Sequence, residues 1–364
     1  MKKKVMVVDD SALMRRVMCD IINSESSFEV IDLSRDGQEA YEKILVHKYD
    51  AIVLDINMPR MDGLELLRKL QREHIDVVVI MASSLTTEGS EQTLEALELG
   101  AIDFVTKPGN IIEARGEDFA NSLLNVLCAV LKVNRTGRKS VGEAITTSKP
   151  QIAVPTRQAE TSRCERSGVK NGNKLVALAC STGGPQSLQK VIPLLPADMN
   201  APVVLVQHMP AGFTKTLANR LNELSKVTVS EAADGDILKK GHVYIAPGGK
   251  HIKIQRQSSG NHVIKIDDSP AVAGLKPCAD IMYESLVNCG YDEIVCVVLT
   301  GMGADGTKGI TTLKEKKPIF TISQDEDSCV VYGMPRAIYE AGISNKVVPL
   351  KNVASTIIMN VGVQ

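Results

Sequence analysis

The sequence contains no tryptophan, and aromatic residues make up only 3% of its 364 residues. Single-stranded nucleic acids are usually bound on stacking platforms of aromatic side chains, so this class of protein is disfavoured. The formal net charge is −1, with 42 basic and 43 acidic residues, which excludes an overall basic field that would attract nucleic acid. No run of about 18 apolar residues occurs, and we therefore expect no membrane span.

Paired cysteine motifs are also lacking. The eight cysteines are scattered singly, with no CxxC pair and no Cys/His spacing typical of a metal site. This usage is typical of reduced thiols in a cytosol, most of them small core residues. The N-terminal MKKKVMVVDD has too short an apolar stretch for a signal peptide. We expect a cytoplasmic protein, long enough at 364 residues for two domains.

In residues 1–133, short apolar strands alternate with helical patterns, which predicts a doubly wound parallel α/β domain. Polar groups stand at the ends of these strands: Asp9, Asp10, Asp55, Ser83 and Lys107. The carboxyl ends of parallel strands share one edge, so we expect these side chains to converge. Three carboxylates there would repel one another unless a cation joined them, and oxygen ligands suit Mg²⁺. A single aspartate is better explained as a helix cap or a turn residue, but five groups at strand ends are not.

Residues 134–173 have almost no apolar periodicity and are rich in Ser, Thr, Gly and Pro. Basic residues outnumber acidic ones in this stretch. The composition predicts a flexible linker between the first domain and a second one at residues 174–364.

The second domain opens with Leu175–Leu188, LVALACSTGGPQSL. Five apolar residues predict a buried strand, and the glycines and proline that follow predict a sharp turn into a helix. Ser181 would then lie at the tip of a strand and near the free N–H groups of a helix, where a serine nucleophile is useful. The alternatives are that Ser181 only caps the helix or that the loop holds a phosphate.

Two more buried strands of this domain end in groups that would complete a nucleophilic site. Pro202–Val206 ends next to His208, and Ile294–Leu299 ends a few residues before Asp305. A serine attacks an acyl carbon when a base takes its proton, and an imidazole works best when a carboxylate fixes its tautomer. Further alternation of strands and helices, with a hairpin near 251–266 and a last helix around 335–340, predicts a mostly parallel α/β sheet.

The motifs VVDDS, LDINMPRMDG, MASS and DFVTKP together resemble the receiver domain of two-component response regulators. The resemblance covers the first domain and implies that a sensor histidine kinase phosphorylates Asp55. It also implies that Mg²⁺ is held by Asp10, Asp55 and the backbone carbonyl of Asn57, with Asp9 acting through water.

The same resemblance implies that Ser83 and Lys107 contact the phosphoryl group and that Phe104 is the aromatic switch position. Receivers fused to esterases often carry glutamate where Asn57 stands in this chain. The side chain at that position affects the lifetime of the phosphoryl group.

The motifs ACSTGGP, QHMP, YIAPGGKH, TGMGADG and SQDEDSCVVYGMPRAI resemble the catalytic domain of chemotaxis protein-glutamate methylesterases. This resemblance implies Ser181 as nucleophile, His208 as general base and Asp305 as its orienting partner. It implies that Thr182 and the backbone of Met302 support the oxyanion. With the receiver in front, the two resemblances span the whole chain except the linker.

The chain departs from the esterase pattern in two places. It has Ala179-Cys180 before the serine, where the family usually has Gly-Ala or Gly-Ser. It has Lys276-Pro277-Cys278 where the family usually has Arg-Pro-Ser. These segments touch the serine turn and the side from which substrate would approach.

Together the resemblances imply a phosphorylation-activated hydrolase of sensory adaptation in chemotaxis. It would remove methyl esters from glutamate side chains on the cytoplasmic helices of chemoreceptors through a serine acyl-enzyme, with deamidation of receptor glutamines as a second activity. The unphosphorylated receiver would cover an open cleft, and phosphorylation would loosen it. The ester chemistry needs no cofactor, and we expect a monomer that meets the membrane only through its receptors.

Two other functions compete with this interpretation. A receiver fused to a nucleotide-binding or scaffold module would explain STGGP and APGGK, but no full GxGxxG is present and His208 and Asp305 would have no role. A DNA-binding output domain would require a basic recognition helix, and none is evident.

Overall fold

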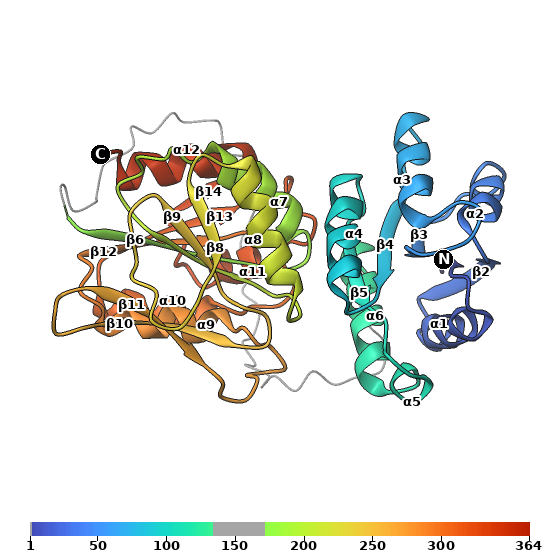
Figure 1. The fold of residues 1–364 in the computed structure, drawn as a ribbon, viewed down its shortest axis with the longest axis horizontal. Coiled ribbons are helices and arrows are strands. Elements are labelled where there is room, and N and C mark those ends of the chain that lie inside the picture. The colour runs from blue at the N-terminus through green and yellow to red at the C-terminus, as the bar shows by residue number, and fades with distance from the viewer. Residues whose placement is uncertain (1, 134–171) are drawn as a thin grey trace, which may run out of the picture.

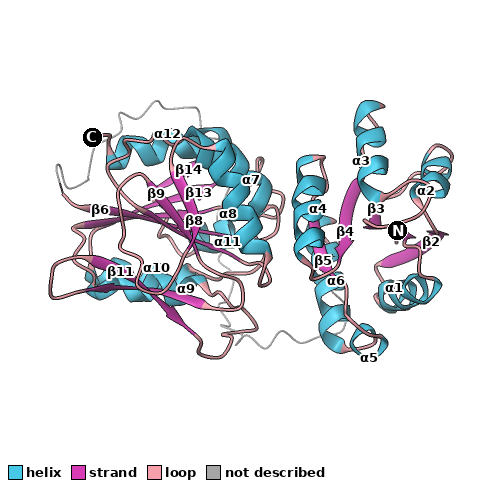
Figure 2. Cartoon of the chain, in the orientation of Figure 1, coloured by secondary structure: helices cyan, strands magenta, loops and turns pink. Residues whose placement is uncertain are grey.

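The computed structural model describes residues 2–133 and 172–364, and Figure 1 shows them as two α/β units, each built on its own sheet. Figure 2 shows that helices lie on both faces of each sheet. Across the described ranges, no helix is both long and apolar enough to cross a bilayer.

The N-terminal sheet has five parallel strands in the order β2-β1-β3-β4-β5. Apolar side chains of α1 and α6 pack on one face, and those of α2, α3 and α4 pack on the other. The elements are β1 (Lys3–Val8), α1 (Ala12–Ser24), β2 (Phe28–Ser34), α2 (Gly37–Ile44), β3 (Ala51–Asp55), α3 (Gly63–Arg72), β4 (Val78–Ser83), α4 (Thr87–Glu98), β5 (Asp103–Thr106), α5 (Ile111–Ala114) and α6 (Glu117–Val130). Burial on both faces explains why the inner strands are continuous apolar runs.

The C-terminal sheet has seven parallel strands in the order β14-β13-β12-β6-β7-β9-β8. Its first elements are β6 (Lys174–Cys180), α7 (Gly184–Val191), the 3₁₀ turn η1 (Ile192–Leu194), β7 (Val203–Gln207), α8 (Phe213–Leu224), β8 (Thr228–Glu231) and β9 (His242–Ile245). An antiparallel hairpin of β10 (His251–Arg256) and β11 (His262–Asp267) forms a separate sheet. The remaining elements are α9 (Ala279–Ser285), η2 (Leu286–Asn288), β12 (Glu293–Val298), α10 (Thr307–Lys316), β13 (Ile319–Gln324), α11 (Met334–Glu340), β14 (Lys346–Val348) and α12 (Leu350–Val361).

Two layers cover the seven-stranded sheet. Helices α7, α8 and α12 pack on one face, while α9, α10, α11 and the hairpin pack on the other. The layer of α7, α8 and α12 is the one next to the N-terminal unit: its helices α7 and α8 contact α4 (Figure 1). One apolar cluster runs from α4, through Leu94 and Leu97, into Leu188 of α7 and Leu217 of α8. The two units are therefore packed together through apolar contacts.

The predicted parallel α/β architecture is confirmed for both units. The expectation that the last helix lies around 335–340 was wrong, since β14 and α12 follow it. Helix α12 buries Val353, Ala354 and Ile357 against the sheet, a helical spacing that the sequence itself displays. Strand β8 was also not predicted. The predicted linker lies almost wholly in residues 134–171, outside the described ranges.

Candidate active site

The order of strands brings three predicted groups to one edge of the C-terminal sheet. Strand β6, which ends before Ser181, lies between β7, which ends before His208, and β12, which precedes the loop that carries Asp305. Chain segments that reach β6 from opposite sides leave a crevice at its carboxyl end, where ligands of such sheets bind. The order of strands therefore brings the ends of β6, β7 and β12 to one edge of the sheet.

The turn after β6 fixes the backbone of Ser181. The Ser181 N–H donates to the carbonyl of Thr300 at 3.0 Å, and its own carbonyl accepts from Gly184 N–H at 2.7 Å. Gly183 has φ +74°, a left-handed conformation that favours glycine. A Cβ at Gly301 would lie 2.8 Å from the Ser181 Cβ, so only glycine lets this loop approach the serine so closely. Ser181 is half-buried in the turn between β6 and α7.

Gln207, the last residue of β7, supports this turn from the next strand. Its Nε2 donates to the Ser181 carbonyl at 3.0 Å, and its Oε1 accepts from the Cys180 thiol at 3.0 Å. Gln207 was not predicted as a site residue, although an amide that directly precedes His208 at the end of a buried strand was a visible signal. Gln207 thus couples the serine turn to the strand that carries the imidazole.

His208 and Asp305 are in direct contact, with Nε2 of the imidazole 2.8 Å from Oδ2 of the carboxylate. Asp305 also accepts from the backbone N–H groups of Ala279 at 2.6 Å and Asp280 at 3.0 Å. Burial raises the pKa of Asp305, but the hydrogen bond and charge of His208 and these N–H groups outweigh it and lower that pKa to about 2. Asp305 is therefore a fixed anion at neutral pH.

The bond to Asp305 uses Nε2 of His208, so Nδ1 is the ring nitrogen that can accept the proton of a hydroxyl. Among the hydrogen bonds of the described part of the chain, none joins the Ser181 hydroxyl to His208. Contacts between nucleophile and base are often long without substrate and tighten when substrate binds. The contact between His208 and Asp305 is thus already formed in this structure, whereas the contact between Ser181 and His208 is not.

The two residues predicted to support an oxyanion lie in different surroundings. Thr182 is buried, and its carbonyl accepts from the hydroxyl of Thr300 at 2.9 Å. The Thr182 side chain lies close to the carboxylate of Asp103 in β5 of the N-terminal unit and opposes the rise in the pKa of that carboxyl. Met302 lies in the glycine loop after β12 and is exposed. The residue next to Ser181 therefore faces the other unit of the molecule.

Other contacts hold the two units together near this edge. Gln186 of α7 donates from Nε2 to the carbonyls of Leu97 at 3.0 Å and Ala101 at 2.5 Å. The rings of Phe104 and Phe213 stack with centroids 4.7 Å apart. The predicted switch residue Phe104 thus lies directly in the contact between the units.

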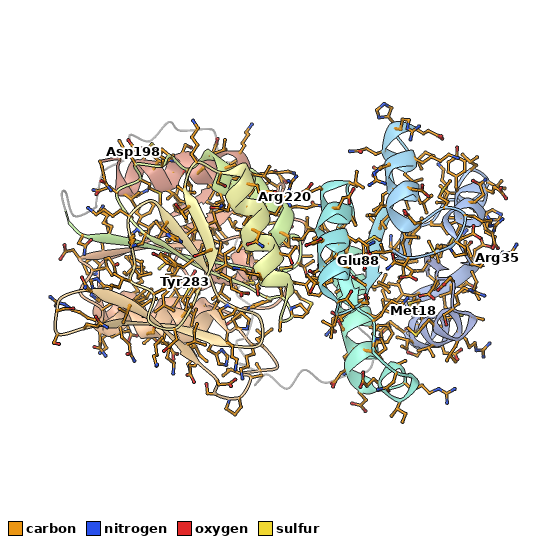
Figure 3. All side chains as sticks on the ribbon, in the orientation of Figure 1. Met18, Arg35, Glu88, Asp198, Arg220 and Tyr283 are labelled. Atoms are coloured by element: carbon orange, nitrogen blue, oxygen red, sulfur yellow. The ribbon has the colours of Figure 1, made fainter. Side chains whose placement is uncertain are left out.

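An ion pair lies at the rim of this contact. Arg220, labelled on α8 in Figure 3, donates to Glu98 of α4 with Nε 2.6 Å from one carboxylate oxygen and Nη2 3.0 Å from the other. This fork geometry is the stronger form of an arginine–carboxylate pair.

A cavity of about 470 Å³ lies between α6 and the loops beside the candidate active site. Lys132 lines it from the N-terminal unit, and Met302, Tyr332 and Arg336 line it from the C-terminal unit. The glycine loop that carries Met302 is thus reachable from a space that both units border.

The predicted acidic rim is present at the edge of the N-terminal sheet. Asp9, Asp10 and Asp55 offer carboxylate oxygens that all lie within 4.8 Å of one another. Lys107 Nζ lies 2.8 Å from Asp9 and 2.9 Å from Asp55. Burial, with the charge of Asp9 added, raises the pKa of Asp55 to about 6, although the charge of Lys107 opposes this shift. Closely spaced oxygen donors with an excess of negative charge fit a small divalent cation such as Mg²⁺.

The remaining predicted groups surround a cavity of about 200 Å³ at this rim, lined by Asp10, Asp55, Asn57, Ser83 and Lys107, among others. Two of them are attached to α4. The Ser83 hydroxyl donates to the Gly89 carbonyl at 3.1 Å, and Asn57 Oδ1 accepts from Gln92 at 3.3 Å. A group that enters the cavity therefore meets side chains tied to the helix that contacts the C-terminal unit.

The fold and these sites define a two-domain α/β protein, with a receiver-type acidic rim on one sheet and a serine, histidine and aspartate at the edge of the other. Residues 5–115 match the response regulator receiver domain, and residues 176–357 match the CheB methylesterase domain. The chain belongs to the CheB methylesterase family.

Relatives match over nearly the whole chain. A protein of Geobacillus kaustophilus named protein-glutamate methylesterase/protein-glutamine glutaminase is 41% identical over 363 residues, 99% of each chain. One of the same name from Bacillus subtilis is 41% identical over 355 residues, 97% of each chain. The crystal structure of the CheB methylesterase catalytic domain of Thermotoga maritima is 41% identical and covers 51% of this chain and 98% of its own, with a TM-score of 0.49.

Proposed function

We propose that this protein is a phosphorylation-activated hydrolase that removes methyl esters from glutamate side chains of chemoreceptors. The observation that carries the proposal is the 2.8 Å contact of His208 with Asp305 at the sheet edge where β6 delivers Ser181. The names of the relatives support glutamate methyl esters of a protein as the substrate class, and they support hydrolysis of glutamine side-chain amides as a second activity.

In the proposed reaction, Ser181 Oγ attacks the ester carbonyl while Nδ1 of His208 takes the hydroxyl proton. Asp305 stabilises the imidazolium that forms. The C–O bond to methanol breaks, and His208 returns the proton to the leaving oxygen. Water then attacks the acyl-serine while His208 takes one of its protons. The bond between the acyl carbon and Ser181 Oγ breaks as His208 returns that proton to Oγ, and the glutamic acid product loses its proton to solvent.

Negative charge develops on the carbonyl oxygen during both attacks. Thr182 and the backbone N–H of Met302 are the proposed donors to that oxygen. The Thr182 side chain lies close to Asp103 of the N-terminal unit, and this proximity supports a closed, inhibited arrangement. Release of the N-terminal unit would free Thr182 as well as open the edge to a receptor helix.

Phosphorylation of Asp55 by a sensor histidine kinase is the proposed trigger. Asp10, Asp55 and the Asn57 carbonyl would hold Mg²⁺, with Asp9 acting through water, and the ion would neutralise charge on the phosphoryl oxygens. Ser83 and Lys107 would turn to the phosphoryl group.

The signal would then pass to the contact between the units. Ser83 would leave its bond to Gly89 of α4, and Phe104 would leave its stack on Phe213. Both changes weaken the contact of α4 and β5 with α7 and α8. The cytoplasmic helices of chemoreceptors are the proposed substrate and the kinase is the proposed phosphodonor.

The test is release of methanol from membranes that carry methylated receptors. Ser181→Ala should abolish release, because it removes the attacking oxygen, while Ser355→Ala on the exposed face of α12 should leave release unchanged. Full activity in Ser181→Ala would refute the catalytic assignment.

A further inference from the structure

Behind the candidate active site lies a fully buried histidine, His251, the first residue of β10. Its Nε2 lies 3.1 Å from the carbonyl oxygen of Pro270, and its Nδ1 accepts from the backbone N–H of Cys278 at 3.2 Å. A carbonyl accepts only and an amide N–H donates only, so the two partners require one tautomer, with the proton on Nε2. The imidazole of His251 is thereby held in one orientation.

The backbone that His251 holds is the segment that holds Asp305. Cys278 is followed by Ala279 and Asp280, whose N–H groups donate to the two oxygens of the Asp305 carboxylate. The Cys278 thiol lies 3.2 Å from the same carboxylate. The bond from Cys278 N–H to His251 therefore fixes the start of this segment, and with it the directions of the Ala279 and Asp280 N–H groups that donate to Asp305.

We propose that His251 is a positioning residue for the serine hydrolase reaction, acting through the backbone of Cys278 on Asp305 and from there on His208. This inference rests on the proposed function. His251 touches no reacting atom. It joins the hairpin, which lies outside the seven-stranded sheet, to the only carboxylate within the described ranges that contacts the imidazole of His208. A displacement of about 1 Å in such a supporting group lowers a rate by roughly a hundredfold.

Two substitutions separate this role from simple packing. In His251→Asn the amide oxygen can take the place of Nδ1 and accept from Cys278 N–H, but the donor to Pro270 is lost. In His251→Gln the longer amide can take the place of Nε2 and donate to Pro270, but the acceptor for Cys278 is lost. Both replace a buried ring by a neutral amide, so each is the packing control for the other.

The assay is methanol release from methylated receptor membranes by the full chain with Mg²⁺ and an acyl-phosphate donor. We expect His251→Asn to keep kcat within about threefold and His251→Gln to lower kcat by roughly ten- to a hundredfold, with KM unchanged in both. Equal losses in the two variants, or a loss confined to KM, would overturn the proposal.

A spectroscopic readout covers the case in which a variant folds poorly or the activity itself is absent. The proton between His208 Nε2 and Asp305 should give a downfield NMR resonance, assigned by its loss in His208→Gln. We expect the resonance to persist in His251→Asn and to shift or vanish in folded His251→Gln. If wild type released no methanol, the proposed function would fail, yet this resonance would still decide whether His251 positions Asp305.

A third variant tests the route of the effect. Cys278→Ala removes the thiol but keeps the backbone N–H that donates to His251. We expect the difference between His251→Asn and His251→Gln to persist in the Cys278→Ala background. Its disappearance there would show that the thiol carries the effect and would overturn the backbone route.

Discussion

Asp55 and Asp305 are both largely buried carboxylates at the carboxyl edge of a parallel sheet, yet their pKa values are shifted in opposite directions. Burial and the charge of Asp9 raise the pKa of Asp55 to about 6, against the opposing charge of Lys107. Burial also raises the pKa of Asp305, but His208 and two N–H groups outweigh it and lower that pKa to about 2. Burial is common to both, so the difference comes from the neighbours.

In both cases the edge of the sheet places the carboxylate, and the hydrogen-bond donors and charges around it determine which function the carboxylate can serve. Asp305 has its oxygens occupied by donors, which suits a group whose charge must stay constant through a reaction. Asp55 shares one lysine with Asp9 and is short of positive charge, which suits a group that gains a cation and a phosphoryl group.

The largest expected effect comes from removing the negative charge of Asp305. Asp305→Asn should lower kcat for methanol release by about 10³- to 10⁴-fold, because the imidazolium loses its anion and the tautomer of His208 is no longer fixed. Asp267→Asn is the matched control, since Asp267 also has a pKa lowered to about 2 but lies on the hairpin, where Lys253 is its main partner. A loss below tenfold would break the comparison.

Next in size is loss of the signal. Asp55→Asn should keep the basal rate of methanol release but abolish its increase on addition of an acyl-phosphate donor and Mg²⁺, since no carboxylate remains to accept the phosphoryl group. Asp20→Asn, on the exposed face of α1, serves as the control and should respond like wild type. Activation that survives in Asp55→Asn would show that another group receives the signal.

The ion pair between the units should give a smaller effect. Arg220→Glu places two acidic groups opposite each other at Glu98 and should raise the basal rate of methanol release by about two- to fivefold, the range of a partly exposed pair. The double variant with Glu98→Arg restores opposite charges and should return the rate toward wild type. Equal basal rates in all three proteins would indicate that this pair does not hold the units together.

The smallest effect concerns Asp103. Burial raises the pKa of Asp103 from its ordinary 3.8 to about 6, although the backbone N–H of Phe104 and the nearby Thr182 side chain oppose this shift. A raised pKa means that the charged form is disfavoured in the closed arrangement. The closed arrangement is therefore most stable below about pH 4 and loses stability as the pH rises to about 6.

The measurement is the rate at which a serine-directed phosphonate labels Ser181, in wild type relative to Asp103→Asn. At pH 5 Asp103 is mostly neutral and the ratio should be close to one. At pH 7.5 the ratio should rise by about threefold, because the ionised carboxylate weakens closure. A ratio that is independent of pH would show that contact with the C-terminal unit does not contribute to the burial of Asp103.

Much of the fold was readable because each strand is a short apolar run that ends in a polar group. That pattern located the ends before Asp9, Ser181 and His208. The adjacency of β12, β6 and β7 could not be read, because strand order depends on packing between segments far apart in the chain. The missed helix α12 is different, since its apolar residues recur at helical spacing and the signal was available.

The supporting residues escaped prediction for a physical reason. His251 and Cys278 both stand in segments that carry the resemblance to the esterases, but they contact each other across 27 positions, and no local pattern shows that they meet. Asp103 and Gln186 act across the contact between the units, and local periodicity contains no information about such a contact. The sequence pattern predicts the polar residues at the ends of strands. The residues that position them, such as His251 and Gln186, are brought there by tertiary packing and cannot be predicted from local pattern.

The surface formed by α4 and β5 of the N-terminal unit is covered by α7 and α8 of the C-terminal unit. A second protein cannot bind that surface at the same time. Any protein that docks on α4 and β5 must compete with the molecule's own second half. Its apparent affinity is reduced by the fraction of molecules that are closed, and its binding raises the fraction that are open. Partner occupancy and hydrolysis are therefore linked by mass action, even in a molecule that carries no phosphate.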